Sequence, residues 1–334
     1  MTLSVICPIY NEERYIRGCV ESVLAQDFPH DDLEVIFADG MSTDGTRDIV
    51  AQYAAAHPWI RLIDNPRRIV PTALNAAIQA SRGDIIMRLD AHASYPPNYF
   101  SALVSSLRET GADNVGGVCI TLPANELPTA QAIAAVLSSR FGMGDSSFRV
   151  GVNKRCEVDT VPFGCWHREV FDRIGLFDED LVRNQDDEFN GRLRKNGGTI
   201  ILCPDVEIKY YGRDKIGKVA RMFYQYGLFK PLVNRKLGSP ATIRQFFPLA
   251  MVVCAILGAI VCLICPKFLW FYASVTALYI ALSLSFSIRS RGSIAKIAIQ
   301  TIVYPIVHFS YGWGYIVGMA KLLCGKGFNV KVNR

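Results

Sequence analysis

Two long apolar runs near the C-terminus constrain this chain more than any other feature of its sequence. Residues 246–265 and 268–288 are each about 20 residues long without a charge, and only Pro266 and Lys267 separate them. Each run is long enough to cross roughly 30 Å of hydrocarbon as a helix. Buried core helices are the alternative, but two uncharged runs joined by so short a connection favour a transmembrane hairpin.

A third apolar segment, residues 297–320, is interrupted by Pro305, His308 and three glycines. Basic residues follow both the second and the third segment, and both groups favour the cytoplasmic side. A single crossing between them would separate the two groups. We therefore expect 297–320 to be re-entrant or to lie at the interface, with a third crossing as the alternative. The expected membrane region is 245–320, followed by a basic tail, 321–334.

The chain before this region has the composition of a water-soluble domain. Its first residues, MTLSVICPIYNEE, lack the basic start and long apolar stretch of a secretory signal. We expect residues 1–235 to form a cytoplasmic domain, attached to the inner cell membrane by a multi-pass anchor.

Positive charge concentrates just before the first apolar run. Residues 206–245 contain nine Lys or Arg and two acidic residues, which favours contact with anionic membrane lipids. Apolar residues at helical spacing among these charges predict an interfacial helix over about 213–232. A solvated helix face is the alternative, and no nucleic-acid-binding motif is present, so we expect no nucleic-acid partner.

The ten cysteines add little to the prediction. The one CxxC pair, Cys262 and Cys265, lies within an apolar run, where cysteine behaves as a small hydrophobic residue. We expect free thiols and no zinc site.

Short apolar runs alternate with helical patterns in the N-terminal half. This alternation predicts a parallel α/β sheet that is covered on both faces. Ser, Thr and Asp near position 43 stand where helix caps belong. The predicted strands are 3–9, 33–39, 60–64 and 83–90, and the predicted helices are 12–26, 42–57 and 71–81.

Acidic residues follow the ends of these predicted strands. Glu12 follows the first, Asp39 and Asp90 end the second and the fourth, and His92 follows the fourth. Ligands of such sheets bind at the carboxyl ends of the strands. No GxGxxG follows the first strand, which disfavours a dinucleotide fold. The acids suit a metal-bridged nucleotide diphosphate better than bare phosphates at a helix N-terminus.

Three stretches in this order resemble the family 2 glycosyltransferases: PIYNEERYIRGCVESVLAQ, ADGMSTDGT and NPRRIVPTALNAAIQASRGDIIMRLDAHA. The DAHA sequence with a C-terminal membrane region is similar to the succinoglycan-type exopolysaccharide glucosyltransferases. The resemblance implies an α/β fold of the GT-A nucleotide-diphospho-sugar transferase type, with a Rossmann-like mixed sheet followed by transmembrane helices.

The resemblance also implies a donor site and a divalent cation, Mn²⁺ or Mg²⁺. The first strand end would lie beside the base and ribose, and Asp39 would hydrogen-bond the base. Asp90 and His92 occupy the metal-binding DxD, with His in place of the second Asp. Neutral imidazole still ligates Mn²⁺; a loop histidine with no ligand role is the alternative. The implied donor-binding residues are Pro8, Tyr10, Glu12, Asp39, Arg67, Asn75, Arg88 and Asp90.

On the acceptor side, NQDDEFNGRLRKNG resembles the family's catalytic motif at the head of a helix. It implies Asp186 as the catalytic base, with Asp187 in reserve on the acceptor side. Gly164 would let the backbone approach the sugar, and Trp166 would stack on an acceptor ring. The alternative is a cluster of acids that is favoured only by the helix dipole.

These observations together predict a membrane-anchored, inverting, metal-dependent hexosyltransferase. It would transfer a sugar from a nucleotide-sugar, a UDP-sugar by expectation, to a lipid-linked saccharide acceptor in cell-surface or exopolysaccharide synthesis. A polyprenyl-phosphate glycosyltransferase is the alternative enzyme, and it would depend less on Asp186 because a phosphate acceptor needs little deprotonation. A catalytically silent membrane scaffold is the alternative from another class, disfavoured by intact Asp39, Asp90 and Asp186.

Overall fold

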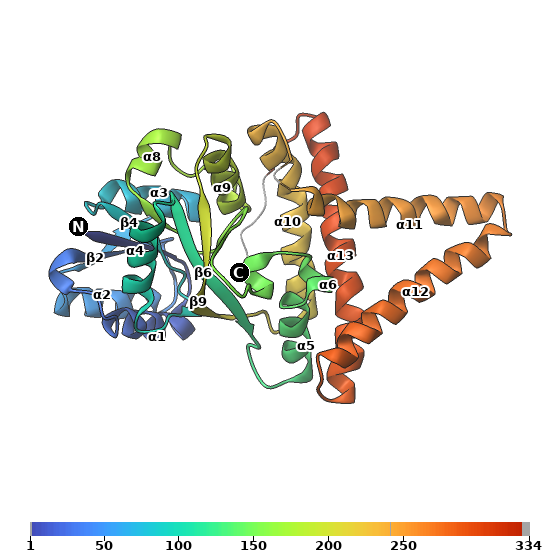
Figure 1. The fold of residues 1–334 in the computed structure, drawn as a ribbon, viewed down its shortest axis with the longest axis horizontal. Helices are drawn as coiled ribbons and strands as arrows, with labels where there is room; N and C mark the ends of the chain where they lie inside the picture. Colours follow the sequence, from blue (N-terminus) through green and yellow to red (C-terminus); the bar gives the residue numbers. More distant parts are fainter. Residues whose placement is uncertain (1, 241, 329–334) are drawn as a thin grey trace. The chain divides into compact units, whose positions relative to one another are not determined.

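The computed structural model describes residues 2–240 and 242–328, which form two compact units (Figure 1). The first unit contains residues 2–120 and 151–210. The second contains the described residues of 121–150 and 211–328.

The described residues form one sheet of nine strands, and its first half is parallel. All seven residues of β1 are buried, as expected for a strand that is covered on both faces. Three of the predicted strands have the bounds that their apolar runs indicate, and the fourth is shorter at both ends. The parallel strands, in sheet order, are β3 (Ile60–Asp64), β2 (Leu33–Asp39), β1 (Leu3–Ile9) and β4 (Ile85–Arg88).

The second half of the sheet is antiparallel. β8 runs against both β4 and β6, and β9 runs against β5 and β7. The parallel sheet that the alternation predicts for residues 3–90 is confirmed by the first half of the sheet, and this antiparallel half confirms the mixed sheet implied by the resemblance. The strands of this half are β5 (Ala93–Ser94), β6 (Asn114–Leu122), β7 (Cys156–Glu157), β8 (Cys165–His167) and β9 (Ile200–Tyr211).

Helices cover the sheet of the first unit. The apolar face of α1, including Ile16 and Val20, shares a core with alternate residues of β1 and with α4. Leu74 and Ile78 of α3 are buried outside this core, and α3 packs on β1 and β2. The helices of this unit are α1 (Glu13–Leu24), η1 (His30–Asp32), α2 (Thr46–Ala56), α3 (Val70–Ala80), α4 (Tyr99–Thr110), α8 (Glu169–Ile174) and α9 (Gln185–Lys195).

The second unit is helical apart from the strand ends that enter it. Two of its helical segments, Ile243–Ile264 and Phe268–Arg289, are the candidate membrane spans among the described residues. The helices are α5 (Pro128–Leu137), α6 (Arg140–Met143), α7 (Ser147–Val150), α10 (Ile216–Leu237), η2 (Ile243–Gln245), α11 (Phe246–Ile264), α12 (Phe268–Arg289) and α13 (Ile294–Leu323).

Two expectations for this unit need correction. The third apolar segment lies within α13, one continuous helix of 30 residues, so it is not a re-entrant loop. The apolar face of α10 does not form a membrane surface, because Val219 and Phe223 pack in a core with α5 and α13. This packing also places α10 in the second unit, so the division by contacts falls at residue 210 and not near 235.

Candidate active site

The carboxyl ends of β1, β2 and β4 bring the strand-end acids of the sequence to one edge of the sheet. β1 lies between the other two strands, with Ile9 opposite Asp39 and Ile6 opposite Arg88. Glu12, Asp39 and Asp90 are buried there despite their charge. Buried carboxylates are retained only where other groups compensate their charge, so their partners define the site.

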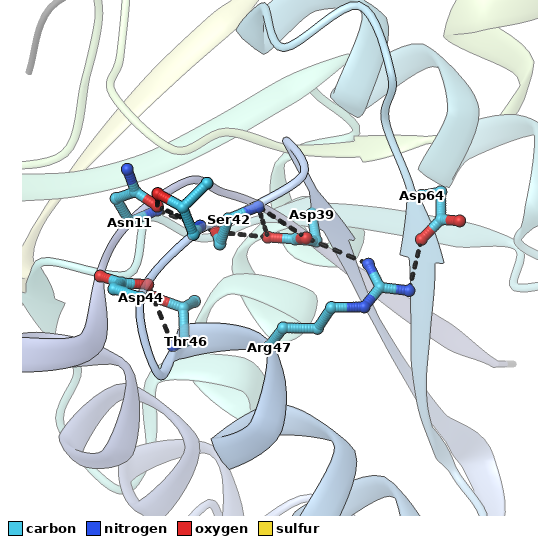
Figure 2. A network of polar contacts seen from close by, with 8 residues as sticks. Asn11, Asp39, Ser42, Asp44, Thr46, Arg47 and Asp64 are labelled. Atoms are coloured by element: carbon cyan, nitrogen blue, oxygen red, sulfur yellow. Dashed lines mark hydrogen bonds and ion pairs between the residues drawn. The ribbon is translucent and has the colours of Figure 1, made fainter.

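Asp39 is fully buried and accepts hydrogen bonds from two residues of the following turn and helix (Figure 2). The Ser42 hydroxyl donates to Asp39 Oδ1 at 2.5 Å, and the Ser42 amide donates to Oδ2 at 3.0 Å. Arg47 Nη1 lies 3.1 Å from the same Oδ2. The carboxylate expected to meet a nucleotide base is thus fixed in place by its own loop.

Arg47 bridges two strands. Its Nη2 lies 2.6 Å from Asp64 Oδ1 at the end of β3, while its Nη1 contacts Asp39 at the end of β2. Hydrogen bonds to Asp64 and Asp39 raise the pKa of Arg47 above its usual value. Sequence reasoning missed this residue, because an arginine in the first turn of α2 reads as an exposed helical side chain.

The loop between β2 and α2 is tied to the loop after β1 (Figure 2). Asn11, with a positive φ of 53°, accepts from the Thr43 amide at 2.8 Å and donates its own amide to Ser42 Oγ at 2.9 Å. The Glu12 amide donates to Thr46 Oγ1 at 2.7 Å. The cap position of α2 is Gly45, which has no side-chain cap bond, so Ser42 and Thr43 join two strand ends instead of capping the helix. Asp44 Oδ1 does accept from the Thr46 amide in the first turn of α2, at 3.1 Å.

Glu12, Asp90 and His92 form a second cluster at this edge. His92 Nδ1 lies 3.5 Å from Glu12 Oε1, and His92 Nε2 lies 4.0 Å from Asp90 Oδ2. The edge of the imidazole also meets the ring of Tyr210, at 5.1 Å between centroids. Asp90 is held by its amide, which donates to Tyr95 Oη at 2.7 Å. The histidine therefore lies between two carboxylates.

The pair of Asp90 and His92 fits a divalent cation in part. Two atoms that each lie about 2.1 Å from one ion are at most about 4.2 Å apart, and Nε2 and Oδ2 meet that limit at 4.0 Å. Glu12 faces Nδ1, the ring atom that a second carboxylate commonly orients in metal sites. No group of three or more His, Cys, Asp or Glu residues among those described is arranged to hold a metal by itself.

Arg88 connects this cluster electrostatically to α9. It is buried, with Nη2 3.3 Å from Asp90 Oδ1 and its guanidinium 5.7 Å from the centroid of the Phe163 ring. Burial lowers the pKa of Arg88, but the negative charges of Asp90 and Asp186 outweigh burial and leave the pKa above its usual value. Asp186 therefore lies close enough to Arg88 that both Asp186 and Asp90 interact electrostatically with its guanidinium.

The three acids at the start of α9 have different surroundings. Asp186 and Asp187 are half-buried, and Asp186 Oδ1 accepts from the Asp187 amide at 2.9 Å. Glu188 is buried against Arg192, which also donates to the Leu176 carbonyl oxygen at 2.8 Å. Glu188 therefore anchors the preceding loop, and the choice of a base narrows to the two aspartates.

The residues expected along the diphosphate divide into two groups. Arg88 belongs to the acid cluster, whereas Arg67 and Asn75 both contact Glu179. Asn75 also exchanges two hydrogen bonds with the Phe177 backbone, at 2.9 and 3.0 Å. Arg67 and Asn75 thus hold the loop between α8 and α9.

At the first strand end, Pro8 is buried within β1 opposite Ala38, and Tyr10 is half-buried. A Cβ atom at Gly40 would lie only 3.1 Å from the Tyr10 side chain. Tyr10 therefore packs closely on the backbone that follows Asp39.

Trp166 does not match its expected acceptor role, and Gly164 packs against its ring. Trp166 is 3% exposed and packs edge to face against Phe171, Phe177 and Phe189. A Cβ atom at Gly164 would lie 2.4 Å from the indole ring, so glycine is needed there for core packing. The prediction that Trp166 stacks on a sugar is wrong, because the aromatic core already covers its ring.

A cavity of about 400 Å³ lies at the opposite, amino edge of the strands. Glu34 in its lining lies 3.4 Å from Arg61 and accepts from the hydroxyl of the neighbouring Ser4 at 2.5 Å. The strand-end acids are absent from its lining, so we place the active site at the carboxyl edge, as the sequence predicts.

Comparison with known proteins identifies the family of this chain. A family model described as glycosyl transferase family 2 matches residues 4–174. Succinoglycan biosynthesis protein ExoA of Rhizobium meliloti (strain 1021) is 31% identical over 249 residues, 74% of this chain and 74% of that protein. A dolichyl N-acetyl-alpha-D-glucosaminyl phosphate 3-beta-D-2,3-diacetamido-2,3-dideoxy-beta-D-glucuronosyltransferase of Methanococcus voltae is 30% identical over 242 residues, 70% of this chain and 74% of that protein.

A solved structure has a similar fold. The mannosyltransferase PcManGT from Pyrobaculum calidifontis, in complex with GDP-Man and Mn²⁺, superposes with a TM-score of 0.56 at 20% identity. The match covers 97% of this chain and 87% of that chain. The family match spans both strand-end clusters, and the chain therefore belongs to glycosyl transferase family 2 and has the GT-A fold.

Proposed function

We propose that this glycosyltransferase of polysaccharide or glycolipid biosynthesis moves a sugar from a nucleotide-sugar to a lipid-linked saccharide, with inversion at the anomeric carbon. The observation that carries the proposal is the chain of buried charges from Glu12 and His92 through Asp90 and Arg88 toward Asp186. These residues line one edge of the sheet, with groups suited to bind a diphosphate at one end and a catalytic base at the other.

The donor would bind along the carboxyl ends of β1 and β2. Asp39 is already fixed by Ser42 and Arg47, so it can accept a hydrogen bond from a base without reorganisation. Arg88 supplies positive charge beside Asp90, where a diphosphate would lie. We propose a UDP-sugar, while the similar Pyrobaculum structure contains GDP-Man, so both nucleotides belong in the test.

Asp90 and His92 would hold a divalent cation, with the donor completing its coordination. When bound, such an ion stabilises the negative charge that develops on the departing nucleotide diphosphate. The presence of a histidine among the ligands favours Mn²⁺ over Mg²⁺. The Mn²⁺ in the similar structure supports this assignment.

Asp186 would accept the proton from the acceptor hydroxyl as that oxygen attacks the anomeric carbon. The bond from the sugar to the diphosphate breaks on the opposite face, through a transition state with oxocarbenium character. Asp187 would lie on the acceptor side of the same helix start. Glu188 is not available, because it is buried against Arg192.

A lipid-linked acceptor would meet this site at a membrane surface. Two apolar helices follow the catalytic region, and the similar Methanococcus protein carries a dolichyl-linked saccharide in its name. We propose that α11 and α12 anchor the enzyme in the cell membrane, with the catalytic unit on the cytoplasmic side.

The test is release of nucleotide by the detergent-solubilised full chain from UDP- and GDP-sugars, with Mn²⁺ or Mg²⁺ and a lipid-linked saccharide extract. Asp186→Asn should lower turnover about 10²- to 10⁴-fold, the usual contribution of general base catalysis. Glu207→Gln, at an exposed position of β9, is the control and should be unchanged. Donor binding by Asp186→Asn should persist, which separates a lost base from a misfolded site.

Other outcomes would redirect the proposal. Equal loss in Asp187→Asn, with Asp186→Asn active, would move the base by one residue. Full activity of both variants with polyprenyl phosphate would indicate a phosphate acceptor. Absence of donor binding in the unmodified enzyme would contradict the catalytic proposal.

A further inference from the structure

The long helix α13 carries an apolar stripe that its own unit leaves uncovered. Trp313, at the centre of the stripe, is 51% exposed, and Ile302 and Leu323 are also exposed. The spacing of the stripe follows one face of a helix, and none of its members is charged. It consists of Ile294, Ala298, Ile302, Phe309, Trp313, Ala320 and Leu323.

The opposite side of α13 is joined closely to α10. A Cβ atom at Gly227 of α10 would lie 2.0 Å from the Tyr311 carbonyl oxygen, and one at Gly318 would lie 2.3 Å from that of Leu228. Backbone meets backbone at these points, and Val219 packs with Val303 nearer the start of both helices. The two helices therefore run alongside each other and must occupy the same depth in or near a membrane.

α10 carries charges that a hydrocarbon core excludes. Lys218 and Arg221 are exposed near its start, and Arg235 and Lys236 are exposed near its end. Charged side chains within a bilayer are rare and almost always face a protein interior or a water-filled cavity. Because α10 lies alongside α13, a crossing of the membrane by α13 would bring these exposed charged side chains toward the hydrocarbon core.

The apolar hairpin leaves α13 from the side of the stripe. Gly312 lies under α11, where a Cβ atom would be 2.2 Å from the Pro248 carbonyl oxygen, and it neighbours Trp313 in the stripe. Figure 1 shows α11 and α12 projecting from α13 on the side away from α10, with α11 lying across α13. If α11 follows the membrane normal, α13 lies along the surface.

We propose that α13 lies flat at the boundary between headgroups and acyl chains, with its stripe toward the lipid, and that only α11 and α12 cross the membrane. Lys296 near its start and Lys321 and Lys326 near its end would meet anionic headgroups. The arrangement places both basic groups of the sequence on one side and leaves Lys267 at the far tip, which agrees with the positive-inside bias. This inference deepens the membrane anchoring proposed above.

Cysteines already present in the chain can test the topology. Cys265 is exposed at the tip of the hairpin, and Cys324 is exposed after α13. Two variants are needed, one that keeps Cys265 and one that keeps Cys324. In each, the other cysteine is replaced by alanine together with Cys156, Cys254 and Cys262. Gln52→Cys, at an exposed position of α2, marks the side of the catalytic unit when both native thiols are replaced.

An impermeant maleimide would be applied to full-length protein in sealed vesicles of one orientation, before and after permeabilisation. We expect Cys324 and Gln52→Cys to react from the same side, and Cys265 only from the other. Reaction of Cys324 together with Cys265 would establish a third crossing and overturn the proposal. Reaction of all three from one side would exclude the hairpin and overturn it as well.

Depth is tested by the fluorescence of Trp313 in a Trp270→Phe variant, with Trp313→Phe in the same background as the blank. In vesicles of phosphatidylcholine and phosphatidylglycerol, lipids brominated near the headgroup should quench Trp313 at least twice as strongly as lipids brominated near the chain end. Stronger quenching from the chain end, or no quenching because a second protein surface covers the stripe, would overturn the proposal. Neither experiment needs turnover, so failure here is distinct from failure of the proposed reaction.

Discussion

Arg47 is the residue that most changes the description of the donor side. Its guanidinium contacts a fully buried carboxylate on β2 and an exposed one on β3. A buried carboxylate without a positive partner is costly, so Arg47 supplies the opposite charge and holds Asp39 in position. We treat it as a positioning residue, because it acts through Asp39.

Arg47→Ala should raise the KM for the nucleotide-sugar about tenfold while kcat changes less than about twofold, because a hydrogen bond to a charged group is worth about 1.5 kcal/mol where it is partly exposed. Arg47→Lys should recover part of the loss, since lysine keeps the charge but not the planar fork that reaches two carboxylates. Steady-state kinetics with donor varied at saturating acceptor make the measurement. An unchanged KM in Arg47→Ala would show that Asp39 does not depend on this bridge.

At the scale of elements, Glu34 joins the amino ends of β1 and β2 to the chain before β4. The Ser4 hydroxyl and the Arg82 amide both donate to its Oε1. Burial raises the pKa of Glu34, but these hydrogen bonds and the Arg61 charge outweigh burial and lower the pKa below its usual 4.5. A carboxyl group whose pKa is lower in the folded state stabilises the fold when the pH is above its unfolded-state pKa. This stabilisation is lost as the pH falls through the folded-state pKa.

Glu34→Gln should therefore lower the free energy of unfolding by about 1–2 kcal/mol at pH 7. The difference from the unmodified protein should shrink as the pH falls below about 4.5, because the unmodified carboxylate then becomes protonated. Thermal unfolding across this pH range is the measurement, with Glu207→Gln as an exposed control. A difference that stays constant with pH would assign the effect to shape and not to charge.

Glycines set how closely α10 approaches α13. Gly227→Ala would press a methyl group against the Tyr311 backbone, whereas a Cβ atom at Gly217 of the same helix meets nothing within 4 Å. Gly227→Ala should cost about 1–3 kcal/mol of stability by overpacking, and Gly217→Ala should be neutral or slightly stabilising because alanine favours helix. Apparent unfolding midpoints in detergent compare the two, and equal midpoints would contradict this packing.

At the scale of the whole molecule, the apolar hairpin is the membrane anchor that we propose. Leu257 is exposed in the middle of α11, and Leu127 is equally large and exposed before α5. Leu257→Arg should disfavour insertion by about 3 kcal/mol, and Leu127→Arg should not affect it. Fractionation of cells into membrane and soluble material measures the change; equal membrane fractions for both variants would argue against a crossing by α11.

The strands of the parallel half can be predicted from the sequence because a strand buried on both faces needs an unbroken apolar run. The end of each run then locates the strand-end acids. Asp186 at the start of α9 is identified by the resemblance of its motif to that of the family, because acids at a helix start by themselves indicate only a favourable interaction with the helix dipole. No local sequence pattern predicts the direction of β8 or the burial of Trp166. Both depend on contacts between residues far apart in the chain.

The sequence by itself determined the α/β half and the two apolar helices, since both follow from local composition and spacing, and its motifs carried the resemblance to the family. Only the tertiary structure decided that Arg47 bridges Asp39 and Asp64, that Trp166 is core, and that the apolar face of α10 meets α13 and not lipid. An apolar face has the same pattern whether protein or lipid covers it, and a charged side chain has the same letter whether it is solvated or paired. The partner that packs against each one resolves the difference.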